Sequence, residues 1–596
     1  MYGNLGEFLK ALEKAGELRF VRRTVSTRLE ISRLTDAESK SADGGKALLF
    51  ESVAESRFPV ATNIFGSDRR ICMAMGVGDL DELGERIRSY TEIQPPRSLR
   101  EIVDFLPMAF ESTRFFPRAL WSGGAPCQEV VSRGGDVDLT KIPVLQCWPG
   151  DAGPFITLPL VITRCPVTGK RNMGMYRMQV YDRRTTGMHW HIHKDGSHYY
   201  GEYARLKRRM PVAVAIGADP ATIYAATAPM PRGLDELILA GFIRKKPVRT
   251  VRCISVDLEV PAEAEFVIEG YVDPGDLRRE GPFGDHTGYY SLADDYPVLH
   301  VTAVTHREKP VYVTTLVGRP PMEDCYLAKA TERMFLPLIQ TVMPEICDYR
   351  FPWEGVFHNA VVVSIQKAYA GHAQKIMSGL WGQGQMSFCK TIVVVDEEVN
   401  PADGQHILEL LVRRLDLDTD ITLMTGVLDV LDHASPYVNF GSKIGIDLTR
   451  RWPGEPPRQE AVEKPQPRQK SGLGSAKSAL PWIADLRNPF KGKFRSEIHD
   501  PGVLFLAVEK DGTTSGRGMA ERLLSAPELD TYRIMVMFDA DIDLSDDSRV
   551  LWKLLNNTDS RRDLVLAGGR AVVDACVKGP ADGHHRQWPE ELTFDP

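Results

Sequence analysis

The N-terminal part of the chain alternates between helical and strand-like patterns. Apolar residues recur at helical spacing over residues 4–20 and 79–90, as on the buried face of an amphipathic helix. Short apolar runs at residues 47–50 and 60–63 are typical of strands. We therefore predict an α/β region in this part of the chain.

The pattern changes between residues 125 and 315. Short β-branched runs recur there between Gly, Pro and Asp, at residues 158–163, 212–216, 248–257, 265–271, 299–305 and 311–316. Such runs are typical of an antiparallel barrel or sandwich. Residues 326–342 then predict a helix, and residues 359–455 return to alternating strands and helices.

The end of the chain repeats part of what precedes it. A proline-rich segment at residues 453–477 is typical of an exposed linker. Three matches span this linker at a constant offset of 143 residues: 361–367 with 504–510, 391–396 with 534–539, and Asp420 with Asp563. A constant offset across strands and acidic loops predicts a duplicated βαβ module. The alternative is that any two βαβ units look alike.

Composition argues against several classes of partner and site. The 596 residues carry a net charge of −7, which provides no field for nucleic acid. No run of about 18 apolar residues is present, and the N-terminus does not resemble a signal peptide. The nine cysteines lack CxxC spacing, which argues against such metal motifs and against a disulfide scaffold. We expect a cytoplasmic protein with no membrane span and no nucleic-acid partner.

The segment from Glu280 to Tyr290, EGPFGDHTGYY, holds the densest candidate chemistry. Proline fixes one φ angle and the glycines permit unusual ones, so we predict a shaped loop rather than a regular element. Glu280 and Asp285 share this loop with a histidine and two tyrosines, a combination suited to proton transfer. A surface turn with solvated acids is the alternative.

Two further groups are candidates from residue type alone. His189, His191 and His193 would share one face of a strand, where imidazoles are candidate metal ligands. No complete ligand set lies nearby in sequence, so the other ligands would come from elsewhere; packing residues are the alternative. Arg177 offers a planar fork suited to a carboxylate, either a substrate's or that of Glu280. An ordinary surface arginine is the alternative.

Eight blocks together resemble the UbiD family of decarboxylases, in the family's order. They are 172–177, 189–193, 211–222, 257–262, 280–290, 318–321, 369–373, and 434–436 with 441–443. The resemblance runs from the N-terminus to about Gly454. It implies an N-terminal α/β domain (1–124), a central split β-barrel flavin-binding domain (125–315), and a connecting helix with a C-terminal α/β domain (316–452). The linker (453–477) and the repeated module (478–596) follow.

The resemblance also implies a cofactor and its ligands. Family members use prenylated FMN, whose phosphate is held through Mn2+ or Mg2+, with K+ nearby. The metal ligands fall on Asn172, His193 and Glu236, although a carboxylate at a helix start such as Glu236 is also a common cap. One imidazole among oxygen ligands suits manganese or magnesium better than zinc. The other implied cofactor-binding residues are Met173, Gly174, Arg177 and Lys443, which leaves His189 and His191 as pocket or packing residues.

The family's catalytic network falls on Arg177, Glu280 and Asp285. Loss of CO2 from an aromatic acid leaves an electron pair that the prenylated flavin can accept. The resemblance assigns Arg177 to the substrate carboxylate and to pairing with Glu280, and Asp285 to returning a proton to carbon. Proton donation requires a raised pKa, and we expect burial of Asp285 against Phe283 and an apolar substrate to raise its pKa.

The long form of the chain is similar to bacterial menaquinone-biosynthesis decarboxylases of the futalosine route, on residues 172–177, 188–191, 328–333 and an extended C-terminus. This similarity implies decarboxylation of a hydroxylated naphthoic or benzoic acid, in particular 1,4-dihydroxy-6-naphthoate. It also implies a flavin prenyltransferase as cofactor supplier and a homodimer or homohexamer. The alternatives are a reversible aryl carboxylase or decarboxylase of another aromatic acid, a non-catalytic subunit of a carboxylase complex, and a plain metal hydrolase.

Overall fold

The chain forms two compact units, Met1–Phe335 together with Glu590–Pro596, and Leu336–Pro589. The computed structural model describes residues 1–92, 108, 110–120, 124–191, 194–458, 476, 479–487 and 502–594. All nine cysteines are free. No helix among these residues is both long enough and apolar enough to cross a membrane. The finer domain boundaries within each unit stay predictions.

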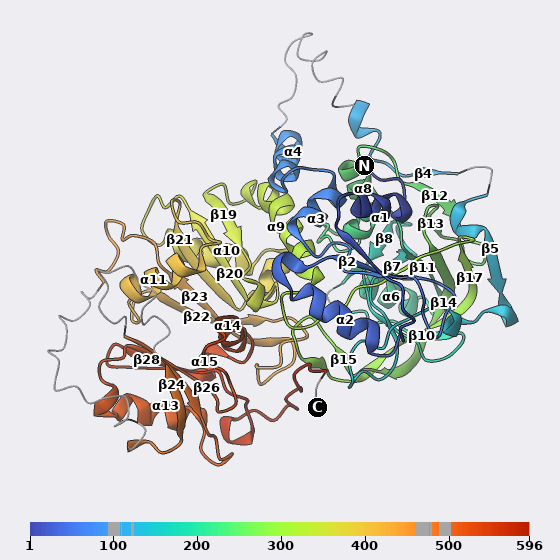
Figure 1. Cartoon of the computed structure of the whole chain (residues 1–596). Helices are drawn as coiled ribbons and strands as arrows, with labels where there is room; N and C mark the ends of the chain where they lie inside the picture. Colours follow the sequence, from blue (N-terminus) through green and yellow to red (C-terminus); the bar gives the residue numbers. More distant parts are fainter. Residues whose placement is uncertain are drawn as a thin grey trace, which may run out of the picture. The chain divides into compact units, whose positions relative to one another are not determined.

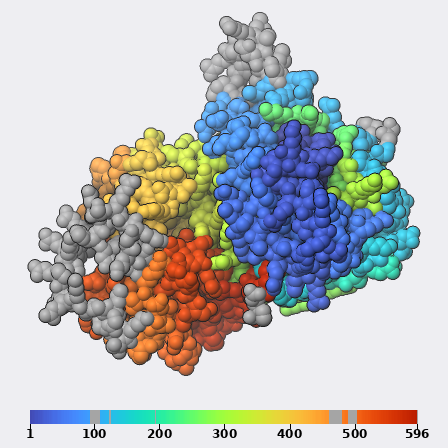
Figure 2. Space-filling view, in the orientation of Figure 1, coloured from blue at the N-terminus to red at the C-terminus, as the bar shows by residue number. Residues whose placement is uncertain are grey.

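The first unit begins with a helix whose regularly spaced apolar residues are buried. In α1 (Leu5–Lys14) the side chain of Asn4 accepts a hydrogen bond from the Glu7 amide, and the buried residues are Leu5, Phe8, Leu9 and Leu12. The cap satisfies an N-terminal amide, and the buried residues form one stripe. Three more helices follow: α2 (Glu30–Ser39), α3 (Asp68–Met75) and α4 (Asp81–Thr91). These early elements form the dark-blue surface in Figure 2.

A four-stranded sheet lies in this N-terminal part, in the order β1-β2-β3-β18. Its strands are β1 (Leu18–Val21), β2 (Ala47–Phe50), β3 (Val60–Thr62) and β18 (Tyr312–Val313). The short apolar runs expected to be strands are therefore strands. The last of them comes from far along the chain, because β18 pairs with β3 in parallel.

The central part is a seven-stranded antiparallel sheet, visible in green and cyan in Figure 1. Its order is β10-β17-β14-β11-β7-β8, with β5 paired to β17. The strands are β5 (Val130–Arg133), β7 (Leu160–Arg164), β8 (Arg171–Gly174), β10 (Thr185–Gly187), β11 (Met210–Ile216), β14 (Phe266–Glu280) and β17 (Asp294–His306). The predicted antiparallel arrangement is confirmed, while its closure into a split barrel stays a prediction.

Smaller elements complete the first unit. They are β4 (Arg118–Ala119), β6 (Phe155–Ile156), β9 (Met178–Gln179), α6 (Asp195–Arg205), α7 (Pro220–Ala225), α8 (Glu236–Arg244), β12 (Arg249–Arg252), β13 (Glu259–Pro261), β15 (Phe283–Gly284) and β16 (Tyr290–Ser291). Helix α9 (Glu323–Gln340) then carries the chain into the second unit.

The second unit contains two five-stranded sheets with the same strand order. The first is β19 (Ile346–Arg350), β20 (Ala360–Ile365), β21 (Thr391–Asp396), β23 (Phe440–Asp447) and β22 (Ile421–Val427). The second is β24 (Ile483–Arg487), β25 (Val503–Val508), β26 (Ile534–Asp539), β28 (Arg570–Asp574) and β27 (Leu564–Ala567). Their helices are α10 (His372–Trp381), α11 (Gly404–Arg414), α13 (Gly516–Ser525), α14 (Asp547–Asn556) and α15 (Ser560–Asp563).

The 143-residue offset is visible in the geometry of the two sheets. Val361 pairs with Ile392 in the first sheet, and Leu504 pairs with Met535 in the second. Asp403 and Asp546, which are also 143 residues apart, each cap the next helix through the side chain. The matching acids are therefore equivalent N-caps, as a duplicated βαβ module predicts.

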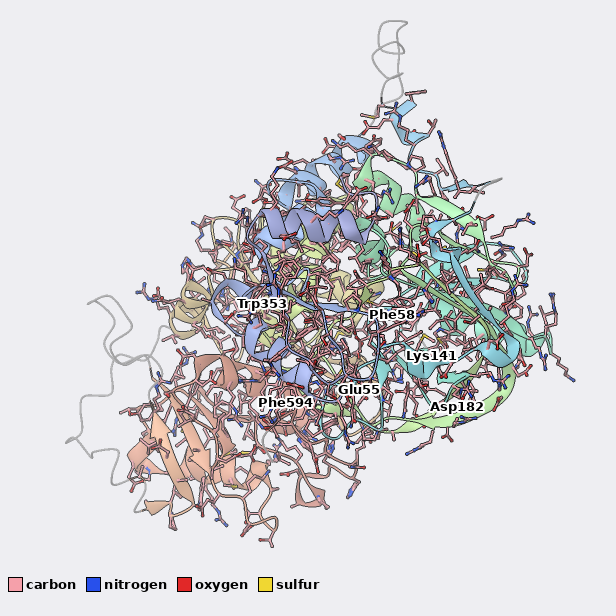
Figure 3. All side chains as sticks on the ribbon, turned by 45° about the vertical axis from the view of Figure 1, so that its right-hand side comes forward. Glu55, Phe58, Lys141, Asp182, Trp353 and Phe594 are labelled. Carbon is pink, nitrogen blue, oxygen red and sulfur yellow. The ribbon has the colours of Figure 1, made fainter. Side chains whose placement is uncertain are left out.

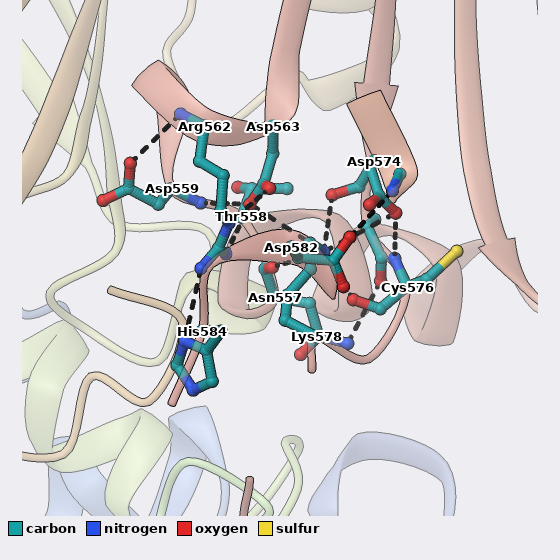
Figure 4. Close-up of polar contacts among 12 residues, drawn as sticks. Asn557, Thr558, Asp559, Arg562, Asp563, Asp574, Cys576, Lys578, Asp582 and His584 are labelled. Atoms are coloured by element: carbon teal, nitrogen blue, oxygen red, sulfur yellow. Dashed lines mark hydrogen bonds and ion pairs between the residues drawn. The ribbon is translucent and has the colours of Figure 1, made fainter. Parts of the chain in front are cut away.

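The repeated module is held together by a buried polar network around Lys578 (Figure 4). The Lys578 side chain is fully buried, and its ammonium donates to the carbonyls of Asn557, Asp574 and Cys576 at 3.3, 2.9 and 2.5 Å. The carboxylates of Asp563 and Asp574 lie 3.8 and 3.6 Å away. One ammonium therefore satisfies several buried acceptors at once.

We expect Lys578→Met to destabilise this module by about 3 kcal/mol, because removing one partner leaves buried charge and carbonyls without a donor. Urea unfolding followed by tryptophan fluorescence measures the loss. Arg561, which is exposed in the same module, is the matched control, and Arg561→Met should leave the midpoint of the urea transition unchanged. An unchanged transition for Lys578→Met would show that the network contributes no net stability.

Candidate active site

Glu280 ends a strand, and Asp285 lies in the turn of the short hairpin that follows it. Glu280 is the last residue of β14. Gly281 follows with φ +85°, a conformation that glycine adopts without strain. β15 then pairs with β16, Phe283 with Ser291 and Gly284 with Tyr290. The predicted shaped loop is present at Gly281, Pro282 and the turn over residues 285–288, while the two-residue strands on either side of this turn were not predicted.

Arg177 joins the two carboxylates. Its Nε donates to Glu280 Oε1 at 3.1 Å, and its Nη1 donates to Asp285 Oδ2. The guanidinium carbon lies 4.6 Å from the centre of the Phe283 ring. Glu280 is 1% exposed and Asp285 is 7% exposed. One buried cation is thus shared between two buried acids, and an aromatic ring covers its face.

His189 extends the network on the other side of Glu280. Its Nδ1 lies 2.5 Å from Glu280 Oε2, and its Nε2 lies 2.6 Å from Nε2 of His191. Burial lowers the pKa of His189, and the charge of Arg177 lowers it further. A neutral ring whose Nδ1–H donates to Glu280 and whose Nε2 accepts from His191 satisfies both contacts. The ring also packs on Tyr296, with centroids 4.2 Å apart.

Asn172 and Glu236 lie on adjoining elements. Asn172 is in β8, and Glu236 is the first residue of α8. The amide of Met173 donates to Glu236 Oε2 at 2.8 Å, and Arg171 binds Asp235 at 2.7 Å, so the strand and the helix start are joined at two points. Both predicted ligands are buried, at 4% and 6% exposure.

The environment of the Glu236 carboxylate fits a bound cation. Burial, together with a smaller effect of the neighbouring acids Asp235 and Asp195, raises the pKa of Glu236 to about 8. A buried carboxylate surrounded by acids is stabilised by a positive ion. Within the described stretches, no three His, Cys, Asp or Glu side chains converge as a cation site, so the predicted site depends on the Asn172 amide and on His193. His193 lies outside the described residues.

Three family models match almost the whole chain. They are the N-terminal domain of 3-octaprenyl-4-hydroxybenzoate carboxy-lyase at residues 9–87, its Rift-related domain at 118–320, and its C-terminal domain at 325–448 and 473–578. An uncharacterised protein of Archaeoglobus fulgidus is 47% identical over 468 residues, 78% of this chain and 94% of that protein. One from Helicobacter pylori J99 is 36% identical over 599 residues, 98% of this chain and 94% of that protein. The chain belongs to the UbiD family.

Solved UbiD-class structures have the same fold. HmfF from Pelotomaculum thermopropionicum, in complex with FMN, is 32% identical with a TM-score of 0.64, covering 80% of this chain and 99% of HmfF. The vanillic acid decarboxylase of Sedimentibacter hydroxybenzoicus in its closed form is 25% identical with a TM-score of 0.68, covering 80% of this chain and 98% of its own. Like them, the chain is a carboxy-lyase of the UbiD class.

Both acids that Arg177 bonds, Glu280 and Asp285, have lowered pKa values in the protein without substrate. Burial raises the pKa of Asp285, but the charge of Arg177 and the contacts with His286 bring the pKa well below its usual range. His286 donates its amide to Asp285 Oδ1 at 2.8 Å, and its Nδ1 lies 2.9 Å from the same oxygen. The pKa of Glu280 is also lowered, since Arg177 and His189 outweigh its burial. These directions describe the protein without substrate, and the raised pKa expected for Asp285 beside an apolar substrate stays a prediction.

Other residues of the predicted set occupy different surroundings. Met173 is fully buried. A Cβ on Gly174 would lie 2.4 Å from the Tyr176 ring, so the close approach requires glycine. Lys443 belongs to the second unit, where its ammonium donates to the carbonyls of Ser387 and Cys389 at 2.6 and 2.8 Å. Burial lowers the pKa of Lys443 to about 8. Its role toward the cofactor stays a prediction.

Sequence reasoning missed two supports of the site. Asp151 accepts from the amide of Gly284 at 2.7 Å and from those of Cys147 and Trp148 at 2.9 and 2.8 Å, and burial raises the pKa of Asp151 to about 7. His189 holds Glu280, although it was expected only as a pocket residue. No local pattern could have predicted these contacts, because Glu280 is 91 residues from His189 and Gly284 is 133 residues from Asp151.

Proposed function

We propose that this UbiD-family chain is a prenyl-FMN-dependent decarboxylase of a hydroxylated aromatic acid. The observation that carries the proposal is the buried Arg177 guanidinium bound to both Glu280 and Asp285. HmfF binds FMN and, in an evolved dimeric form, prenylated FMN, and the Sedimentibacter enzyme decarboxylates vanillic acid. These activities of its structural neighbours support the cofactor and the reaction class.

Arg177 orients the substrate. The Phe283 ring covers the face of its guanidinium, and Glu280 binds its Nε. At Nη1, a substrate carboxylate can therefore take the place of Asp285. A substrate carboxylate replaces Asp285 there, and a planar fork is the geometry that binds a carboxylate. The burial of both acids keeps water away from this exchange.

Asp285 becomes the proton donor through this exchange. While Arg177 contacts Asp285, the carboxyl is ionised because its pKa is lowered. Once the substrate carboxylate has replaced Asp285 at Nη1 of Arg177, burial dominates and raises the pKa of Asp285, since desolvation disfavours the charged form. Asp285 then takes up from solvent the one proton that the overall reaction consumes, and it delivers that proton to the carbon that has lost CO2. Glu280 stays ionised through Arg177 and His189.

Asn172, His193 and Glu236 hold the cofactor's divalent cation, Mn2+ or Mg2+, in this proposal, with K+ nearby and Met173, Gly174 and Lys443 as further cofactor contacts. When bound, prenylated FMN supplies the electron sink that decarboxylation of an aromatic acid requires. The surroundings of Glu236 support a cation, because the acids beside it raise its pKa.

We expect Glu236→Gln to weaken Mn2+ binding by at least about 100-fold and to lower flavin content with it, because the ligand loses its charge while keeping its shape. Mn2+ titration of the flavin-free protein and the flavin absorbance of the purified protein measure the two effects. Asp257, whose side chain is 89% exposed, gives the control Asp257→Asn. Unchanged Mn2+ affinity in Glu236→Gln would remove Glu236 from the ligand set.

As substrate we propose 1,4-dihydroxy-6-naphthoate, in menaquinone biosynthesis in the cytoplasm. The support is the long-form similarity, which the full-length match to the Helicobacter pylori relative extends to 98% of the chain. The test is to coexpress the chain with a flavin prenyltransferase and to measure CO2 release from a panel of naphthoic and benzoic acids. Release from a benzoic acid alone would favour a decarboxylase of another aromatic acid. Turnover with metal and without flavin would favour a hydrolase.

A further inference from the structure

The C-terminal segment Glu590–Phe594 lies against the hairpin that carries Asp285. The structure places this segment with the first unit, although the chain reaches it from the second unit, which ends at Pro589. Figure 1 shows the red end of the chain, which includes this segment, near β15. Its backbone adds a third strand-like edge to the hairpin: the Tyr290 amide donates to the Glu590 carbonyl at 3.0 Å, and the Leu592 amide donates to the Gly288 carbonyl at 2.9 Å.

These bonds join the C-terminal segment to the turn of the hairpin. Tyr289 and Glu591 form an antiparallel bridge, and Tyr289 is 2% exposed. Within the turn, the Asp285 amide donates to the Tyr289 carbonyl at 3.1 Å. The backbone of Asp285 is therefore linked to the C-terminal segment through Tyr289, whose carbonyl binds the Asp285 amide and whose two neighbours, Gly288 and Tyr290, are hydrogen-bonded to the segment.

Side chains of the segment reach the residues that flank Asp285. The Phe594 ring, labelled in Figure 3, stacks on Trp148 with centroids 4.4 Å apart and planes inclined by 26°. Arg33 donates to the Phe594 carbonyl at 2.9 Å. Leu592 lies so close to Gly284 that a Cβ there would be 2.9 Å from Leu592 Cδ2 and 2.2 Å from the Trp148 ring. Glycine at 284 is required for this approach.

We propose that Leu592 and Phe594 are positioning residues for Asp285. Trp148 and Leu592 pack against Gly284, and Asp151 binds the Gly284 amide, so the residue before Asp285 is fixed from two sides. The C-terminal segment then fixes residues 288–290 on the far side of the turn. The carboxyl of Asp285 is thereby held opposite Arg177, where a displacement of about 1 Å can cost about 100-fold in rate. This inference rests on the proposed catalytic role of Asp285.

The test compares the variants Phe594→Ala and Leu592→Ala with the parent enzyme. We expect kcat to fall about 10-fold or more in both variants, with KM and flavin content within about two-fold of the parent, since substrate and cofactor contacts remain. Phe594→Tyr keeps the stacked ring and should restore kcat. Phe116, an aromatic residue that is 56% exposed, provides the matched control Phe116→Ala, which should leave kcat unchanged.

Hydrogen exchange of residues 284–291 tests the positioning without turnover. We expect exchange of the Tyr290 amide to become about 10-fold faster in Phe594→Ala, with exchange in the central sheet unchanged. Unchanged exchange together with unchanged kcat would overturn the proposal, as would a loss of kcat that Phe594→Tyr does not restore. If the parent enzyme decarboxylates no tested acid but exchange still accelerates, the proposed function fails and the ordering of the turn by the C-terminal segment stands.

Discussion

Arg177→Ala is expected to lower kcat/KM for decarboxylation by about 1,000-fold while flavin stays bound. The guanidinium bonds both Glu280 and Asp285, and in the proposed mechanism it also binds the substrate carboxylate. Arg177→Lys should recover only a part of this loss, because an ammonium lacks the planar fork that bonds two acceptors in fixed directions. Steady-state kinetics with the acid identified by the CO2 panel measures the effect.

The control for this change is Arg183→Ala. Arg183 pairs with Asp138 at 3.2 Å, and its side chain is 63% exposed, so its loss should leave both kcat and KM in place. Flavin absorbance separates a catalytic loss from a loss of cofactor. Full activity in Arg177→Ala would remove this residue from substrate binding and with it the observation on which the proposed function depends.

Asp285→Asn is expected to lower kcat by about 100-fold to 10,000-fold, the range that a positioned proton donor contributes. Asparagine keeps the shape and can still accept from His286, but it carries no transferable proton. In the parent enzyme, kcat should fall as pH rises through the pKa that Asp285 has in the substrate complex. This limb of the pH profile should be absent from the residual activity of Asp285→Asn. A profile that keeps the limb would assign it to another group.

The same variant has an expected effect on stability that needs no turnover. The folded-state pKa of Asp285 is lowered, so its ionised form stabilises the fold above the unfolded pKa of about 4 and loses this contribution as pH falls. Asp285→Asn should therefore weaken the dependence of the urea midpoint on pH below about 4. Asp294→Asn, at an exposed residue, is the control and should leave that dependence unchanged.

Local patterns were sufficient for several elements. The apolar stripe of α1 and the short runs that became β2 and β3 were predicted because helix and strand periodicity depend on neighbouring residues alone. The hairpin at β15 and β16 was not predicted. Its glycines and proline are typical of turns, and its two-residue strands are too short to show an alternating pattern.

Some features of the site could likewise be predicted from the sequence, and others could not. Motif resemblance selected Arg177, Glu280 and Asp285, and the structure brings these three together. The direction of the Asp285 pKa could not be predicted, because it depends on whether burial or the Arg177 charge is larger, and both come from residues distant in sequence. The support from His189 was missed for the same reason.

The sequence by itself determined the UbiD family, several of the helices and strands, and the 143-residue repeat, because each depends on residue identity and spacing along the chain. Only the tertiary structure decided that Arg177 is shared between two acids and that the last described residues, Glu590–Phe594, lie with the first unit on the Asp285 hairpin. Charge pairing and strand addition join segments that are at least 103 residues apart. No local pattern specifies which partner a buried charge or an unpaired strand edge will meet.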